Sequence, residues 1–149
     1  MNVKLVTVAD RTPLLIEQLL NVWEGSVKAT HHFLSEKEIE TIKNYVPQAL
    51  HEIPHLIVAE DETKAPVGFM GIADQHLEML FIAPEVRGKG LGKQLLNYGI
   101  EAYSVRSLAV NEQNPLAKGF YEHMGFQVYK RTEIDEQGNP YPLLYMSRP

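Results

Sequence analysis

The 149-residue chain contains no cysteine. Disulfide bonds, thiolate metal sites and a covalent acyl-cysteine intermediate are excluded, because each of them requires a thiol. Any group transfer by this chain must therefore use other side chains or pass directly from one substrate to another.

Long apolar runs and basic clusters are absent as well. No N-terminal stretch has the apolar length of a signal peptide, and no segment approaches the thickness of a membrane. The net charge is −5 and no run of Lys and Arg is present, which argues against nucleic acid as a partner. We therefore expect a cytoplasmic protein without a membrane or nucleic-acid partner.

The residues that are present are typical of one globular domain. The apolar fraction is 44% and the charged fraction 22%, as is usual for a folded, soluble protein. The length allows one domain with a substantial core, and no linker, repeat or low-complexity segment divides the chain. We expect a single domain over residues 1–149, and the sequence leaves a homodimer open.

Apolar periodicity predicts strands that alternate with amphipathic helices. Thr12 and Asn114 are good helix N-caps, and Ser35 forms a capping box with Glu38. Pro47 should kink or end the second helix. The predicted strands cover 3–8, 55–60, 67–73, 76–83, 107–110, 126–134 and 143–146. The order β-α-α-β-β-β-α-β-α-β-β predicts an α/β (α+β) fold with a mixed sheet of about seven strands flanked by four helices.

The segment from His76 to Tyr98 reads HLEMLFIAPEVRGKGLGKQLLNY. It predicts a strand that ends at Pro84, a glycine-rich turn and a helix. The start of a helix attracts anions through its unpaired N–H groups and its dipole, and glycines let a phosphate approach the main chain. Arg87 and Lys89 add positive charge at the same place. The segment therefore predicts a site for a phosphorylated cofactor, with the pyrophosphate of coenzyme A as the best candidate.

Two other glycine-loop motifs fit less well. The Walker pattern has Ser or Thr after its Lys to bind Mg²⁺, but Gln94 follows Lys93 here. The dinucleotide motif needs G-x-G-x-x-G after a first strand, whereas this spacing is G-x-G-x-G and too little chain follows for a second nucleotide-binding half. A phosphotransferase stays open as an alternative that nucleotide and Mg²⁺ dependence would reveal.

Residues 87–92, RGKGLG, match the pattern R/Q-x-x-G-x-G/A and resemble the acetyl-CoA loop of the GNAT N-acetyltransferase superfamily. The predicted element order is similar to that of this superfamily, and residues 111–126 resemble its N-x-x-x…FYxxxGF segment. Residues 23–34, WEGSVKATHHFL, and the PYPLL stretch at 140–144 resemble a YjaB-like bacterial subgroup. The chain is thus identified as a member of the GNAT superfamily by a resemblance that spans nearly its whole length.

The resemblance implies acetyl-CoA as cosubstrate, no metal, and direct transfer of an acetyl group to a primary amine in a ternary complex. It also implies that the strand backbone at 80–82 pairs with the pantetheine arm, while the glycine loop and the next helix bind the pyrophosphate. The implied cofactor-binding residues are Leu80, Phe81, Ile82, Arg87, Gly88, Lys89, Gly90, Leu91, Gly92, Asn114 and Tyr121.

Two catalytic residues follow from the same resemblance. Glu78 occupies the strand register at which several GNAT enzymes carry their base, and Tyr121 matches the Tyr that protonates the departing thiolate. His76 lies two residues before Glu78 on the same face of the strand, so it is an alternative base. His31 is an implied substrate-binding residue, since this family builds its acceptor pocket beside the connection between the first two helices. His76, on the strand, is the second substrate-binding candidate.

The adjacent His31 and His32 also invite interpretation as a metal site. Neighbouring residues rarely point the same way and no Asp or Glu stands at ligand spacing, so a surface loop with one packed His is favoured. The acceptor stays open among a small amine, a peptide N-terminus and a lysine side chain, because acceptor loops vary freely. A non-catalytic module that senses acyl-CoA on the same fold is the alternative to an enzyme.

Overall fold

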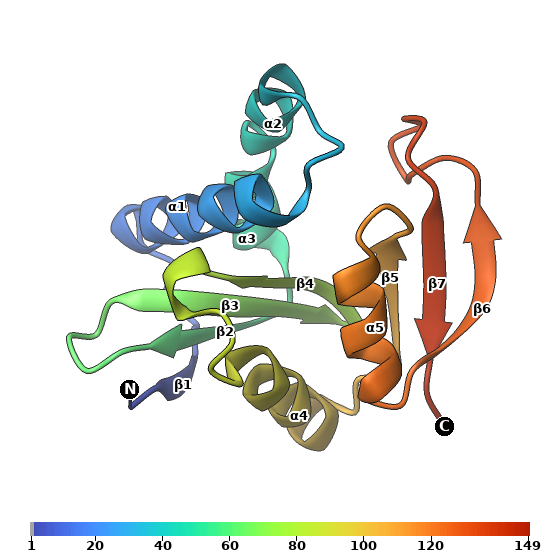
Figure 1. Ribbon diagram of the computed structural model, residues 1–149. Helices are drawn as coiled ribbons and strands as arrows, with labels where there is room; N and C mark the ends of the chain where they lie inside the picture. Colours follow the sequence, from blue (N-terminus) through green and yellow to red (C-terminus); the bar gives the residue numbers. More distant parts are fainter. Residues whose placement is uncertain (1) are drawn as a thin grey trace.

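The computed structural model of the chain describes residues 2–149 and contains a seven-stranded mixed sheet (Figure 1). The strand order is β1-β2-β3-β4-β5-β7-β6. Neighbouring strands are antiparallel except for β4 and β5, which run parallel. The strands are β1 (Lys4–Thr7), β2 (His55–Glu60), β3 (Pro66–Ala73), β4 (His76–Ile82), β5 (Ser107–Asn111), β6 (Gln127–Thr132) and β7 (Leu143–Ser147).

The predicted order of strands and helices is confirmed, and the segment predicted as the second helix is divided in two. Glu38 N–H donates to Ser35 Oγ at 3.1 Å, as expected for the capping box. The division falls at Asn44–Tyr45, and Pro47 lies in the first turn of the following helix, where its missing N–H is not needed. The helices are α1 (Pro13–Thr30), α2 (Glu36–Lys43), α3 (Val46–Glu52), α4 (Leu91–Tyr103) and α5 (Pro115–His123), with a 3₁₀ turn η1 at Pro84–Val86.

The helices cover both faces of the sheet, with α1, α2 and α3 on one side and α4 and α5 on the other (Figure 1). The apolar stripe of α1, which includes Leu19 and Trp23, is buried against β3 and β4. Leu95 and Leu96 of α4 are buried from the opposite side. β3 and β4 are thereby held at the centre of the core. Among residues 2–149, none of the helices has both the length and the apolar character needed to cross a membrane.

β4 and β5 separate from each other along their length. They pair at His76 with Ser107 and at Leu77 with Leu108, and no pairing continues beyond these two positions of β4. The backbone of residues 79–82 therefore has no strand beside it on the β5 side. Its N–H and C=O groups on that edge are left for another partner.

A β-bulge in β4 accompanies this separation. Met79 lies opposite Gly71 of β3 and Leu77 lies opposite Ile72, so Glu78 is an extra residue without a partner in the register. A bulge bends its strand and increases the local twist. β4 therefore turns away from β5 directly after Glu78, and the sheet opens at the position of the candidate site.

Candidate active site

The loop between β4 and α4 forms a cradle of backbone N–H groups. Gly88 and Gly90 have φ angles of +78° and +79°, a conformation that residues with a side chain rarely adopt. The first N–H to bond within the helix is that of Gln94, which donates to the carbonyl of the N-cap Gly90 at 3.0 Å. The N–H groups of residues 91–93 therefore have no partner within the helix. The dipole of α4 adds partial positive charge at this end. The cradle has the donors and the charge to hold a phosphate group.

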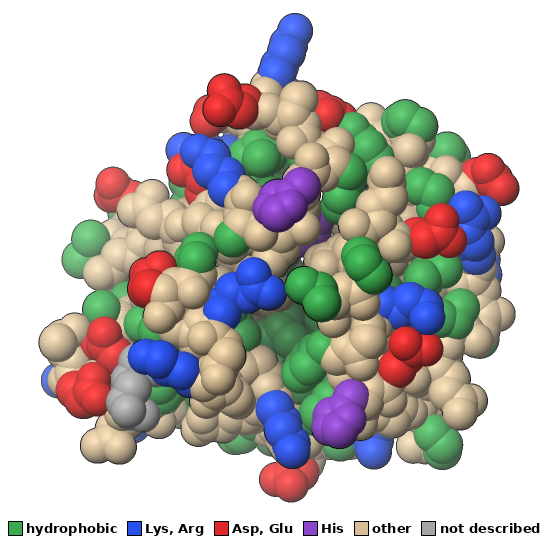
Figure 2. Space-filling model, viewed as in Figure 1, with side chains coloured by type: hydrophobic (Ala, Val, Ile, Leu, Met, Phe, Trp, Pro, Cys, Tyr) green, Lys and Arg blue, Asp and Glu red, His purple; other side chains and the backbone are tan. Residues whose placement is uncertain are grey.

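A cavity of about 350 Å³, which we call the cofactor-side cavity, extends from this cradle to α5. Figure 2 shows a hollow on this face, with hydrophobic side chains in its floor and Lys and Arg side chains around it. Lys89 is exposed in the loop and is not part of the cavity wall. The predicted cofactor-binding residues that line the cavity are Leu80, Phe81, Ile82, Arg87, Gly88, Gly90, Leu91, Gly92, Asn114 and Tyr121.

Asn114 connects the start of α5 with the cofactor-side cavity. Its side-chain oxygen accepts a hydrogen bond from the N–H of Ala117 at 3.3 Å, which confirms the predicted N-cap. The same side chain lines the cofactor-side cavity, and its amide NH₂ group takes no part in the cap. Capping and ligand binding are compatible because they use different atoms.

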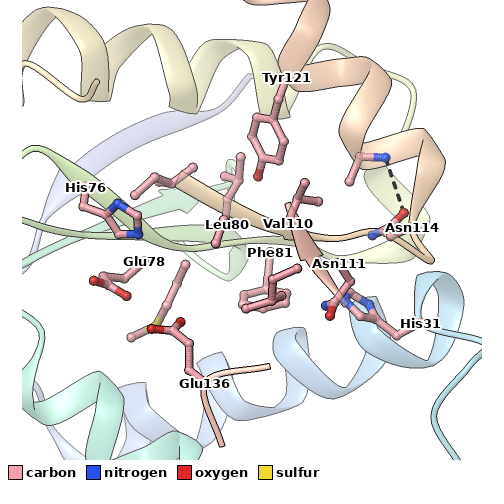
Figure 3. Close-up of a pocket in the computed structure, with 15 residues that line it drawn as sticks. His31, His76, Glu78, Leu80, Phe81, Val110, Asn111, Asn114, Tyr121 and Glu136 are labelled. Carbon is pink, nitrogen blue, oxygen red and sulfur yellow. Dashed lines mark hydrogen bonds between the residues drawn. The ribbon is translucent and has the colours of Figure 1, made fainter. Parts of the chain in front are cut away.

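Tyr121 lies at the inner end of the cofactor-side cavity. Its ring packs beside Phe120 and Phe126, with centroid distances of 5.2 and 6.2 Å. Figure 3 shows its hydroxyl directed toward the gap between β4 and β5. Burial raises the pKa of the Tyr121 phenol well above its usual range. The hydroxyl therefore stays protonated at physiological pH and is available as a proton donor.

A second cavity, of about 230 Å³, lies beside the opening of the sheet, and we call it the channel (Figure 3). His76 and Glu78 of β4 and Tyr121 of α5 line it. The side chain of Glu78 is exposed, and His76 Nδ1 lies 2.7 Å from Ser107 Oγ. The structure thus brings the two polar side chains predicted on β4 together with the predicted proton donor.

A third cavity, of about 410 Å³, lies between α1, α2 and the loop that joins β6 to β7, and we call it the α1–α2 cavity. Much of its wall is apolar or aromatic. Carboxylates on α2 and on the β6–β7 loop add negative charge, partly balanced by Lys37. The apolar and aromatic residues are Trp23, Val27, Phe33, Leu34, Ile42, Phe81, Tyr141 and Leu143, and the acidic residues are Glu38, Asp135 and Glu136.

His31 and Phe81 line all three cavities. His31 is half-buried at the end of α1, whereas the neighbouring His32 is exposed. Burial lowers the pKa of His31, and the charge of His32 lowers it further. Within residues 2–149, no group of three or more His, Cys, Asp or Glu side chains is arranged to hold a metal ion.

Sequence reasoning missed Thr30, Asn111 and Glu136. Asn111 and Glu136 line both the channel and the α1–α2 cavity, but their places depend on how β5, β6 and β7 pair, for which no local signal exists. Thr30 Oγ1 donates to the carbonyl of Ser26 at 2.8 Å and lies 2.7 Å from His31 Nδ1. The sequence does contain a signal for this contact, because a Thr in the last turn of a helix can bond back to a helix carbonyl and here stands next to a His.

Comparisons with known proteins identify the family of the chain. Residues 27–141 match the family described as an acetyltransferase (GNAT) domain. The chain is 44% identical over 131 residues to the peptidyl-lysine N-acetyltransferase YjaB of Escherichia coli, which covers 88% of both chains. The solution structure of apo YjaB from Escherichia coli matches with a TM-score of 0.88 and 39% identity, over 99% of this chain and 97% of the other.

A more distant neighbour is the PaiA N-acetyltransferase of Thermoplasma acidophilum in complex with coenzyme A. It covers 99% of each chain with a TM-score of 0.68 and 21% identity. At this identity the likeness is one of fold alone.

The fold and the family match together define an acyltransferase. The chain belongs to the GNAT family of acetyltransferases, whose activity is acetyl transfer from acetyl-CoA. The predicted fold and the predicted enzyme class, an N-acetyltransferase, are both confirmed.

Proposed function

We propose that the protein transfers an acetyl group from acetyl-CoA directly to the side-chain amine of a lysine in a peptide or protein. The observation that carries this proposal is that the cofactor-side cavity, the channel and the α1–α2 cavity share His31 and Phe81 in their walls. A thioester from one side and an amine from the other would come together there. The name of the YjaB relative, a peptidyl-lysine N-acetyltransferase, supports lysine as the acceptor.

The cofactor-side cavity fits coenzyme A in its donor chemistry. The N–H groups at the start of α4 and the side chains of Arg87 and Lys93 would hold the pyrophosphate. The unpaired backbone of β4 at Leu80 to Ile82 would bond to the amide groups of the pantetheine arm, as an added strand would. When bound, acetyl-CoA supplies an acyl thioester that an amine can attack.

The α1–α2 cavity fits a lysine side chain. Lysine combines an aliphatic stem with a charged ammonium group. Trp23, Leu34 and Leu143 would contact the stem, and the carboxylates of Glu38 and Glu136 would attract the ammonium group. A cavity with apolar walls and acidic groups therefore favours a lysine over a neutral acceptor.

The acceptor nitrogen must lose a proton before it attacks, and the sulfur must gain one as it leaves. Glu78, with His76 as the alternative, is the base that the sequence predicts, and both line the channel. Tyr121 would donate to the sulfur. Because the chain has no cysteine, transfer within a ternary complex replaces an acyl-cysteine intermediate.

Calorimetry with acetyl-CoA and mass spectrometry of a peptide with a free N-terminus and one internal lysine test this function together. The protein should bind acetyl-CoA, and peptide fragmentation should place the acetyl group on the lysine. Gly90→Glu should weaken acetyl-CoA binding by about tenfold or more, because the new side chain and its charge oppose the pyrophosphate.

Gly138→Glu is the matched control. Gly138 also has a positive φ, +84°, and open space around it, but it lies outside the cofactor-side cavity. This variant carries the same strain and charge and should bind acetyl-CoA as the wild type does. Failure of the wild type to bind would overturn the proposal, whereas binding without transfer to any primary amine would favour the sensing module.

A further inference from the structure

His31 lies where the thioester and the acceptor amine would meet. Among residues 2–149, His31 and Phe81 alone line all three cavities, and of these two only His31 can exchange a proton. Figure 3 shows His31 on the α1 side of the sheet and Tyr121 on the α5 side, both directed into the channel. A nitrogen in the channel would lie between a group that can accept a proton and a group that can donate one.

The hydrogen bonds of Thr30 determine which nitrogen of the His31 ring carries the hydrogen. Thr30 Oγ1 donates to the carbonyl of Ser26 at 2.8 Å, one turn back in α1. A hydroxyl has a single hydrogen, so toward His31 Nδ1, at 2.7 Å, the Thr30 oxygen is an acceptor. Nδ1 therefore carries the hydrogen, and Nε2 of the neutral ring keeps a free lone pair.

The surroundings favour the neutral ring. Burial is the larger of the two causes that lower the pKa of His31, and His32 is the other. The basic groups that adjoin His31 in sequence or along a cavity wall are His32, Lys37 of α2, His76 of β4, and Arg87 and Lys93 near the cradle. The acidic ones are Glu38 of α2, Glu78 of β4, Tyr121 of α5, and Asp135, Glu136 and Tyr141 of the β6–β7 loop. Groups of both signs line the three cavities, and burial is the main cause of the lowered pKa of His31.

Glu78 is less well placed to take a proton from the acceptor. It is exposed in the β-bulge, and it lines the channel but neither of the two larger cavities. From this position its charge can attract a cationic substrate toward the channel. It does not adjoin the point at which the cofactor-side cavity and the α1–α2 cavity meet.

We infer that Nε2 of His31 is the catalytic base, an inference that rests on the proposed function and gives His31 the role that the sequence resemblance assigned to Glu78. One proton of the acceptor ammonium passes to Nε2. The freed lone pair forms the bond to the acetyl carbon, and the electron pair of the C–S bond leaves with sulfur, which takes the proton of the Tyr121 hydroxyl. The proton that the new amide nitrogen then loses restores Tyr121, and His31 releases its proton to solvent.

The test is the pH dependence of kcat, measured with saturating acetyl-CoA and lysine peptide. Wild-type kcat should decrease as the pH drops through the pKa of His31, which lies below about 6.5, because protonated His31 cannot accept a proton. His31→Gln should lose this acid limb and lower kcat at neutral pH by about 100-fold or more. Its acetyl-CoA affinity by calorimetry should stay within about twofold.

His32→Gln is the matched control. It should keep the wild-type kcat and move the acid limb to higher pH, because the neighbouring charge that lowers the pKa of His31 is gone. Thr30 is a positioning residue, so Thr30→Val should lower kcat more than it raises KM. Nitrogen-15 NMR of the imidazole gives a readout independent of turnover, and it should show hydrogen on Nδ1 in the wild type and a mixture of tautomers in Thr30→Val.

Two results would overturn the assignment and leave the proposed function intact. One is a His31→Gln variant with wild-type kcat and an unchanged acid limb. The other is hydrogen on Nε2 rather than Nδ1 in the neutral wild-type ring. A wild type that acetylates no amine would overturn the proposed function, and the role of His31 with it.

Discussion

The hydroxyl of Tyr141 donates a hydrogen bond to the carboxylate of Glu38, which lies 103 residues away along the chain. Both residues line the α1–α2 cavity, so the bond joins the β6–β7 loop to α2 across one side of it. Phe33 supports the contact, with its ring centroid 5.3 Å from that of Tyr141. One side of the cavity that we propose for the acceptor is therefore formed by residues that lie far apart in the sequence.

Removing this hydroxyl with Tyr141→Phe should raise the pKa of Glu38, because the bond from Tyr141 is the main cause that lowers it. A lowered pKa in the folded state contributes stability at neutral pH that is lost as the pH falls through that pKa. The melting temperatures of the wild type and the variant should thus differ at pH 7 and converge in acid. Carbon-13 NMR titration measures the pKa, and Tyr145→Phe should leave it unchanged. An unaltered pKa of Glu38 in Tyr141→Phe would contradict the bond.

Tyr121→Phe should lower kcat by about 100-fold, because the leaving sulfur loses its proton donor. The ring keeps its packing against Phe120 and Phe126, so acetyl-CoA affinity should change little. Steady-state kinetics and calorimetry separate the two effects. Tyr129, which is 60% exposed, supplies the control Tyr129→Phe, and a Tyr121→Phe variant as fast as this control would exclude the role.

Glu78→Gln distinguishes the base predicted from the sequence from the one inferred from the structure. If His31 is the base, the variant should raise the KM for a lysine peptide by a few-fold and lower kcat by less than about tenfold. The KM effect should shrink at high salt, because attraction by an exposed charge is screened. Kinetics at two ionic strengths measure this. A loss of about 100-fold in kcat would return the role of base to Glu78.

Two substitutions of Asn114 separate capping from cofactor binding. Asp caps a helix as well as Asn does, so Asn114→Asp should keep the stability of the protein and weaken acetyl-CoA binding, since a charged oxygen replaces the NH₂ donor. Asn114→Ala should lose both the cap, at about 1 kcal/mol, and the contact. Denaturant unfolding and calorimetry provide the two measurements. Wild-type affinity in Asn114→Asp would show that the amide does not contact the cofactor.

The helices, the strands and the glycine cradle could be predicted because the sequence signals for them are local. Ser35 and Glu38 cap α2 within one turn of chain, and the glycine pattern at 88–92 specifies left-handed backbone at the start of α4. Runs rich in β-forming residues predicted the strands, and the antiparallel pairing of β2 with β3 follows from the short polar turn between them. Such features depend on a few consecutive residues, so they can be predicted without knowledge of the rest of the fold.

Other features depend on contacts between distant segments. The bulge at Glu78 arises from the pairing of β4 with β3, and no residue type in β4 predicts it. The place of Glu136 depends on where the β6–β7 loop meets α2, which the pairing of β6 with β7 determines. Pro47 indicated an interruption of the second helix, but its exact place at residues 44–45 depended on packing.

By itself the sequence determined the family, the order of elements, the glycine cradle and the absence of a cysteine intermediate, because motifs and composition are properties of the chain. Only the tertiary structure decided that the cofactor-side cavity, the channel and the α1–α2 cavity share His31 in their walls. The physical reason is that a catalytic base needs a position and a tautomer. The tautomer is set by hydrogen bonds at the end of α1, but the position is set by the packing of α1, β4 and α5, which come together only when the sheet forms and opens between β4 and β5.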